Sequence, residues 1–176
     1  MERGLVHLYY GDGKGKTTAA AGLGLRAWGR GKTVLMVQFL KGFDSGEILA
    51  LGRLGGRCRL FPGTPVKKFT GSMSAREREQ TALEQRRMFF GAAEQCLSGL
   101  CDVAVFDELV DAVNLGAVSV PEVADFIRSP ARMCEVVITG HRPDPAFFEF
   151  CDYITEMKKI RHPFDRGIRA RDGIEK

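Results

Sequence analysis

Short apolar runs alternate with amphipathic stretches along most of the chain. Runs bounded by glycine, proline or polar turns predict strands at 5–10, 33–40, 57–61, 103–106, 136–138 and 153–157. Helical spacing predicts helices from Thr17 to the glycines at 29 and 31, and over 47–54, 75–97, 120–127 and 145–150. This alternation predicts an α/β fold with three layers, a mainly parallel sheet between helices on both faces.

Two local patterns sharpen this prediction. The strand at 33–40 is almost continuously apolar, as expected where both faces of a parallel sheet are covered. Ser74 precedes Glu77 by three residues, the spacing of a capping box, and so predicts the start of the long helix. The preceding stretch, 62–75, reads as a loop whose Phe69 and Met73 either anchor it to the core or form an apolar lip for a large flat ligand.

Length and composition fit one globular domain over residues 1–176. The chain is 44% hydrophobic and 27% charged, an ordinary balance for a protein of 176 residues. Its first residues lack the apolar core of a signal peptide, and there is no run of eighteen apolar residues. We therefore expect a cytoplasmic protein with no membrane association.

The cysteines give no sign of a disulfide framework or a zinc ribbon. Their number, five, is odd, and they form no C-x-x-C pair. We expect reduced thiols, most of them buried.

Positive charge is concentrated at the end of the chain. Seven basic and three acidic residues lie within 158–176, so this segment alone accounts for the net charge of +4. Such a segment is either a solvated basic tail or a surface that meets phosphate or nucleic acid.

The strongest chemical signal is the glycine-rich stretch between the first strand and the first helix. It predicts a phosphate-binding loop formed by Gly11, Asp12, Gly13, Lys14, Gly15, Lys16, Thr17 and Thr18. Lys16 would reach the phosphates and Thr17 would ligate Mg²⁺. The usual pattern has a glycine where this chain has Tyr10, so the motif is a variant, and the alternative is a flexible glycine turn.

A second signal lies at the end of the fourth strand. Asp107 and Glu108 follow an apolar run, at the edge where open α/β sheets bind ligands, and could hold Mg²⁺ together with Thr17. The alternative is a pair of acids in a surface turn. Lys41 follows the second strand at the same edge, where it either borders the ligand or is simply solvated. The histidines share no metal-ligand spacing, so no metal site is predicted for them.

In several places the sequence resembles the P-loop type of corrinoid adenosyltransferase. The resemblance covers nearly the whole chain and rests on GDGKGKTTAA from Gly11, GKTV from Gly31, VQFLKG from Val37, VFDEL from Val105, VVITG from Val136 and HPFDRGIRARDGIE from His162. That family also lacks the earliest loop glycine. The resemblance implies a P-loop NTPase-like, RecA-like fold.

It also implies a reaction, in which the 5′-deoxyadenosyl group of ATP passes to a cob(I) corrinoid and triphosphate is released. By analogy, Lys16 and Glu108 would be the catalytic residues, and Thr17, Asp107 and Glu108 would bind Mg²⁺. Lys41 and Phe69 would lie toward the corrinoid. The family further implies a homodimer, supplied by a reducing flavoprotein, and places the basic ending at the active site and away from nucleic acid.

Two features depart from the family. Its members usually carry Phe and Trp two residues apart in the loop that corresponds to 62–75, whereas the only tryptophan here is Trp28. The chain is also expected to begin at its first strand, without the N-terminal extension of some members. The altered aromatic loop leaves open an ATP-dependent corrinoid carrier without transfer activity, and the basic tail leaves open a nucleic-acid-dependent ATPase.

Overall fold

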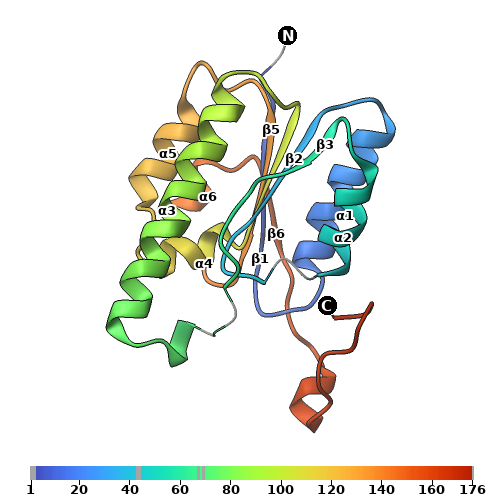
Figure 1. Ribbon diagram of the computed structural model, residues 1–176, viewed down its shortest axis with the longest axis vertical. Helices are drawn as coiled ribbons and strands as arrows, with labels where there is room; N and C mark the ends of the chain where they lie inside the picture. Colours follow the sequence, from blue (N-terminus) through green and yellow to red (C-terminus); the bar gives the residue numbers. More distant parts are fainter. Residues whose placement is uncertain (1–2, 43–44, 67, 69, 176) are drawn as a thin grey trace.

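One parallel sheet organises the molecule. The computed structural model describes residues 3–42, 45–66, 68 and 70–175 (Figure 1). The sheet has the order β3-β2-β4-β5-β1-β6, and every neighbouring pair is parallel. The strands are β1 (Val6–Tyr10), β2 (Val34–Gln38), β3 (Cys58–Leu60), β4 (Val103–Asp107), β5 (Glu135–Gly140) and β6 (Tyr153–Glu156). The predicted strands are thus confirmed, and the sheet is parallel throughout the described strands.

Helices cover both faces of this sheet. They are α1 (Lys16–Gly29), α2 (Gly46–Leu54), α3 (Ala75–Leu97), α4 (Leu109–Asn114), α5 (Val120–Arg128) and α6 (Phe147–Phe150), with short 3-10 turns at Thr70–Ser72 and Pro163–Arg166. In Figure 1, α1 and α2 lie on one side of the sheet, and α3 to α6 lie on the other. The predicted three-layer architecture is confirmed.

The core is divided by the sheet into two apolar clusters. Val34 and Met36 of β2 pack in the cluster beneath α1 and α2, whereas Leu35 and Val37 pack in the larger cluster beneath the other helices. Successive side chains of a strand point to opposite faces, so a strand covered on both sides must be apolar at every position. This explains the unbroken apolar run in the sequence.

Local sequence signals predicted the ends of most helices, but one helix was not predicted. Ser74 and Glu77 form the predicted capping box at the start of α3. Helix α4 was not predicted, because six residues are too few to show helical periodicity. Burial of Leu109, Val110 and Ala112 against the core stabilises it instead.

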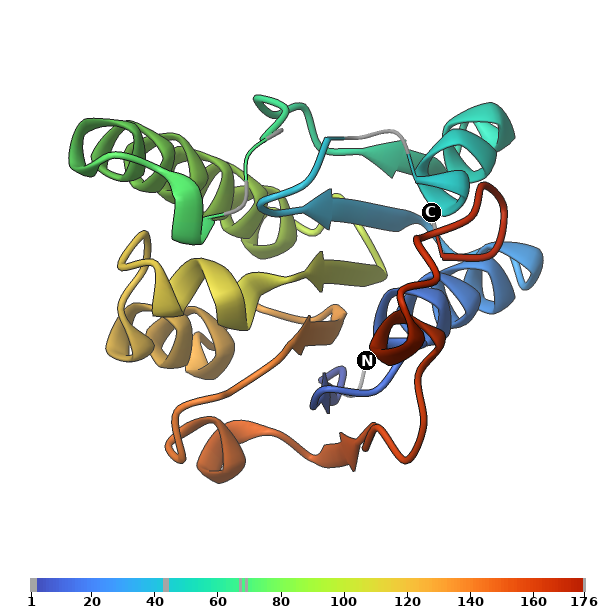
Figure 2. The ribbon, with the colours of Figure 1, turned by 90° about the horizontal axis from the view of Figure 1, so that it is seen from below.

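The C-terminal segment packs beside the phosphate-binding loop (Figure 2). The N–H of Met157 donates to the Tyr10 carbonyl at 2.7 Å, and the N–H of Gly13 donates to the Met157 carbonyl at 2.6 Å. The N–H of Lys159 donates to Oδ1 of Asp12 at 2.9 Å. The segment after β6 is therefore hydrogen-bonded to the phosphate-binding loop, although Lys159 and Asp12 are 147 positions apart in the sequence.

Two further predictions concern the cysteines and the membrane. All five cysteines are free, and only Cys151 is more than marginally exposed, as expected for reduced core thiols. No helix within the described ranges combines the length and the apolar character needed to cross a bilayer.

Candidate functional site

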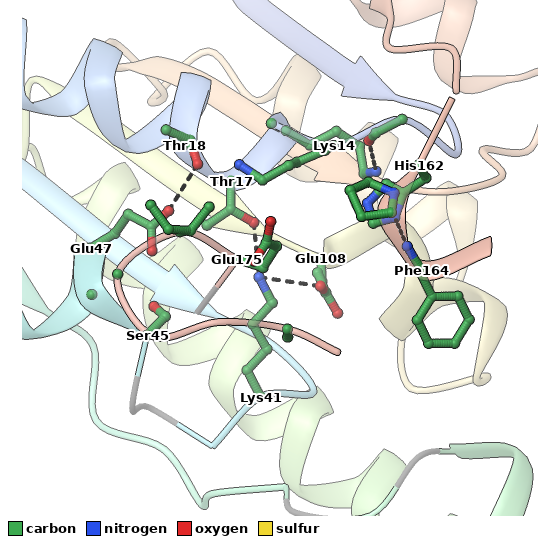
Figure 3. A pocket seen from close by; sticks show the side chains of 18 of the residues that line it. Lys14, Thr17, Thr18, Lys41, Ser45, Glu47, Glu108, His162, Phe164 and Glu175 are labelled. Carbon is green, nitrogen blue, oxygen red and sulfur yellow. Dashed lines mark hydrogen bonds and ion pairs between the residues drawn. The ribbon is translucent and has the colours of Figure 1, made fainter. Parts of the chain in front are cut away.

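A cavity of about 770 Å³ opens at the carboxyl ends of the strands (Figure 3). Its floor is the predicted phosphate-binding loop from Asp12 to Thr18, and one wall is the C-terminal segment, from which His162, Phe164 and Arg169 line it. The loops after β2, β4 and β5 contribute Lys41, Glu108 and His141. Four strand ends and the chain terminus thus converge on one pocket, the usual ligand position in such a sheet.

The loop at its floor is a backbone cradle. Gly15 adopts a left-handed conformation with φ of 111°, and α1 begins at the next residue. Gly11 also has a positive φ, and its N–H donates back to the carbonyls at the end of β5, so it supports the loop from behind. The start of α1 therefore faces the cavity with free N–H groups and the positive end of the helix dipole, which suits an anion.

Lys16 lies folded over this cradle. Its Nζ donates to the Gly13 carbonyl at 2.9 Å. Burial lowers the pKa of Lys16, while the nearby carboxylates of Asp111 and Glu108 act in the opposite direction. The ammonium is thus already positioned over the anion site.

Asp107 is the centre of a polar cluster beside the cradle. Its side chain is fully buried, and Oδ1 accepts hydrogen bonds from Thr17 at 2.9 Å and from Thr139 at 2.7 Å. Oδ2 accepts from Nε2 of Gln38 at 3.1 Å and from Lys41 at 2.8 Å. Buried carboxylates require such compensation, and these bonds hold the strand ends in register around the pocket.

Lys41 is the cation of this cluster and is not a solvated lysine. Its Nζ lies 2.8 Å from Oγ1 of Thr17, 2.8 Å from Asp107 and 3.2 Å from Oε1 of Glu108. Burial acts to lower the pKa of Lys41, but the charges and hydrogen bonds of Asp107 and Glu108 outweigh burial and raise it. Lys41 therefore carries its charge at neutral pH, on the phosphate side of the cavity.

Backbone geometry directs Glu108 into the pocket. This residue has φ of 61°, an uncommon value outside glycine, and its N–H donates to Oγ1 of Thr139 at 2.8 Å. Burial raises the pKa of the Glu108 carboxyl, and the charge of Lys41 opposes this effect. The left-handed turn ends β4 and starts α4, which leaves the carboxylate facing the cavity.

The oxygen atoms of this cluster fit a hard divalent cation. The ammonium of Lys41 lies among the hydroxyl of Thr17 and the carboxylates of Asp107 and Glu108. The position between these oxygens is therefore already occupied by a positive charge. Oε1 of Gln38, beside Asp107, is buried without a hydrogen-bond partner among the described residues. A hydrated Mg²⁺ would bring both the charge and a water proton that this oxygen could accept.

Comparison with known proteins identifies the family to which this chain belongs. Residues 2–175 match the family model described as ATP:corrinoid adenosyltransferase BtuR/CobO/CobP. The chain belongs to the ATP:corrinoid adenosyltransferase family. Its curated relatives include the corrinoid adenosyltransferase of Escherichia coli K12, with 32% identity over 99% of this chain and 86% of the relative. Others are CobA of Salmonella typhimurium, at 31% identity over the same shares, and the Pseudomonas aeruginosa enzyme, at 32% over 99% and 84%.

Family membership confirms the predicted class of enzyme and its two substrates. The chain is an adenosyltransferase that uses ATP and a corrinoid. This member of the family therefore carries Tyr10 where the usual phosphate-loop pattern has its first glycine.

The structure brings most of the predicted site residues together. One cluster is formed by Thr17 of the phosphate-binding loop with Asp107, Glu108 and Lys41. Lys41 lies on the side of the phosphate-binding loop. Phe69 lies outside the described residues. Sequence reasoning overlooked Gln38 and Thr139, whose signal was a polar residue at the end of an otherwise apolar strand.

His141 adds a pH-sensitive charge to the pocket wall. Its Nδ1 lies 3.1 Å from Oδ2 of Asp111, and this hydrogen bond raises the pKa of His141 above its ordinary value of 6.5. The protonated imidazole attracts a triphosphate, and this attraction is complete below the raised pKa and is lost as the pH rises through it. We expect ATP affinity to fall as the pH rises through this raised pKa of His141.

Calorimetric titration of ATP against pH tests this expectation. The terminal phosphate of ATP also ionises near neutral pH and acts in the opposite direction, so the comparison with His141→Asn isolates the histidine. A pH dependence of ATP affinity that is the same in both proteins would contradict the assignment.

Gly13 is required by the close approach of the C-terminal segment. A Cβ at this position would lie 2.5 Å from the carbonyl oxygen of Met157 and 2.8 Å from its carbon. We expect Gly13→Ala to lower the free energy of unfolding by about 1–3 kcal/mol and to weaken ATP binding, because backbone must move.

Gly22→Ala is the matched control for this substitution. Gly22 lies in α1, where an added Cβ meets nothing within 4 Å. We expect it to stabilise the protein by about 0.5–1 kcal/mol, because alanine favours helix. Chemical denaturation measures both variants, and equal stability of the two would show that Met157 does not constrain the loop.

Proposed function

We propose that this chain transfers the 5′-deoxyadenosyl group of ATP to the cobalt of a reduced cob(I) corrinoid. The cobalt–C5′ bond forms with the electron pair of Co(I), the C5′–oxygen bond breaks, and triphosphate departs with that bonding pair. The observation that carries the proposal is the convergence of the phosphate-binding loop, Lys41 and Glu108 on one cavity in a chain of this family. The product is an adenosylated corrinoid such as adenosylcobalamin or adenosylcobyrinic acid a,c-diamide.

In this reaction the protein has to position ATP and to stabilise the charge of the leaving group, and it does not have to supply a general base. No proton is removed from the nucleophile, so the barrier falls when ATP is held in line and the leaving group is stabilised. The backbone N–H groups from Lys14 to Thr18 would hold the triphosphate, since the N–H of Gly13 already donates to the Met157 carbonyl. Lys16 would stabilise the negative charge that grows on it, and Lys41 would add a second positive charge from the far side of Thr17.

The oxygen cluster would hold the metal ion. We propose that Thr17 and Glu108 ligate Mg²⁺ and that Asp107 supports it, directly or through water, since Asp107 already accepts the Thr17 hydroxyl. Bound Mg²⁺ would neutralise part of the triphosphate charge. The Lys41 ammonium, which lies among the same oxygens, would then shift toward a phosphate oxygen.

The basic C-terminal segment would serve this pocket. His162 and Arg169 line the cavity, and the N–H of Lys159 is bound to Asp12 of the phosphate-binding loop. These contacts favour a role in binding ATP over a role in binding nucleic acid. The exposed ring of Phe164 at the same wall offers apolar surface for a flat corrin face.

The resemblance to the family supports further proposals about context. We propose a cytoplasmic homodimer that receives its corrinoid from a reducing flavoprotein. Size-exclusion chromatography with light scattering measures the oligomeric state. Adenosyl transfer with a flavodoxin-type donor in place of a chemical reductant tests whether a flavoprotein can supply the reduced corrinoid.

The identity of the ATP-derived product tests the reaction itself. The protein is incubated with ATP, Mg²⁺ and chemically reduced cobalamin, and the expected products are adenosylcobalamin, followed by its absorbance, and triphosphate. Release of ADP alone would overturn the proposal. Tight binding of both substrates without turnover would favour the corrinoid carrier, which the departure from the family's aromatic pair in the loop keeps as the alternative.

A further inference from the structure

Three buried cysteines meet at the end of the sheet opposite the phosphate-binding loop. Cys96 ends the apolar face of α3, Cys101 precedes β4 and Cys134 precedes β5. Their sulfur atoms all lie within 4.8 Å of one another, and the sulfurs of Cys96 and Cys101 are 3.7 Å apart. The loops that carry Cys101 and Cys134 lie at the upper edge of the sheet in Figure 1.

Two arginines supply positive charge to this cluster. Arg132 is 2% exposed, and its N–H groups donate to the carbonyls of Ile127, Gly4 and Cys134, which satisfy them without cancelling the charge. Hydrogen bonds from Cys101 and Cys96, together with the charge of Arg132, lower the pKa of Cys134. The hydrogen bond with Cys134 and burial raise the pKa of Cys101, and the charge of Arg59 opposes this effect. Nε of Arg59 is buried without a hydrogen-bond partner among the described residues. A thiolate is therefore electrostatically supported at Cys134, where the other two thiols donate to it.

We propose that Cys96, Cys101 and Cys134 form a binding site for one thiophilic monovalent cation, Cu(I). Three sulfurs at about 2.3 Å from a common centre lie roughly 4.0 Å apart when the centre is in their plane. The sulfurs of Cys96 and Cys101 are 3.7 Å apart, and no pair of the three exceeds 4.8 Å. Thiolate ligands select soft cations. Structural Zn²⁺ requires four ligands, and within the described residues this cluster supplies three cysteine sulfurs.

Charge and protons balance at such a site. Binding of Cu(I) displaces the remaining thiol protons to solvent, and three thiolates with one monovalent cation carry a charge of −2. The guanidinium groups of Arg132 and Arg59 oppose that charge. No oxidant or reductant takes part, because the cation enters and stays as Cu(I).

The site lies just beneath exposed residues and is independent of the proposed transfer reaction. Cys101 and Cys134 are 6% and 3% exposed, and each follows an exposed residue, Leu100 or Met133. Strand β4 runs from the cluster to Asp107, its last residue, and the four steps from Val103 alone span about 13 Å. Failure of the copper site would leave the adenosyltransferase proposal unaffected.

Anaerobic titration of the reduced full-length protein with Cu(I), in competition with bicinchoninate, tests the site. We expect one equivalent of tight binding. We expect Cys96→Ser, Cys101→Ser and Cys134→Ser each to weaken the Cu(I) affinity by more than about tenfold, the scale on which even a supporting group changes metal affinity. The controls Cys58→Ser and Cys151→Ser remove thiols outside the cluster and should bind Cu(I) as the unmodified protein does.

X-ray absorption of the copper-loaded unmodified protein counts the sulfur ligands, so the test does not depend on the folding of any variant. Three sulfur neighbours support the proposal. Fewer than three sulfur neighbours, absence of binding against bicinchoninate, or an affinity unchanged in folded Cys134→Ser would each overturn it.

Discussion

Lys16→Ala is expected to reduce adenosyl transfer by about 10²- to 10³-fold, the loss typical when one group that stabilises a leaving anion is removed. The ammonium lies over the phosphate cradle, 2.9 Å from the Gly13 carbonyl. Its partner is a backbone carbonyl of the same loop, so its loss should leave the fold intact. Triphosphate release and calorimetric ATP binding measure the effect.

Lys14→Ala is the matched control for Lys16→Ala. Lys14 lies in the same loop and lines the same cavity, but its side chain is exposed, so the substitution removes the same charge while keeping every backbone N–H. We expect a loss of less than about tenfold, because an exposed charge is screened by solvent. Equal losses in the two variants would mean that Lys16 contributes only general positive charge. Full activity of Lys16→Ala would refute its assigned role.

Glu108→Ala is the second substitution with a large expected effect, because Glu108 is proposed to hold Mg²⁺ opposite Thr17. We expect the Mg²⁺ concentration for half-maximal turnover to rise by at least about tenfold, with partial recovery at high Mg²⁺. The Glu108 carboxylate is 3.2 Å from Lys41, which keeps Asp107 and Thr17 as partners when Glu108 is lost. The free energy of unfolding should therefore change by only about 1 kcal/mol or less.

Glu108→Gln separates charge from shape at this position. Glutamine keeps the size of the side chain and one ligating oxygen but removes the negative charge. We expect a smaller rise in the Mg²⁺ requirement than in Glu108→Ala. If the Mg²⁺ dependence of turnover is the same in both variants and in the unmodified protein, Glu108 is not a metal ligand.

Features that depend on neighbours in the sequence could be predicted before the structure. The apolar run of β2, the capping box at Ser74 and the glycine-rich loop before α1 each follow from backbone sterics or local hydrogen bonds. The position of Asp107 and Glu108 at a strand end was predictable for the same reason, because parallel strands share one carboxyl edge.

Features made by distant segments could not. Lys41 meets Asp107 across 66 positions, and the C-terminal segment joins Asp12 across 147. Helix α4 is too short to leave a periodic signal, and its burial alone stabilises it. The cysteines at 96, 101 and 134 have no ligand spacing in the sequence, yet the end of α3 and the connections into β4 and β5 bring their sulfurs together at one sheet edge.

The sequence by itself thus determined the α/β architecture, the phosphate-binding loop and, through its resemblance to a family, the class of reaction. Only the tertiary structure decided that Lys41 belongs to the acid cluster, that the basic ending forms a pocket wall and that three thiols share one site. The physical reason is that backbone conformation depends on the nearest few residues. Which distant side chains come into contact depends on the order of the strands in the sheet.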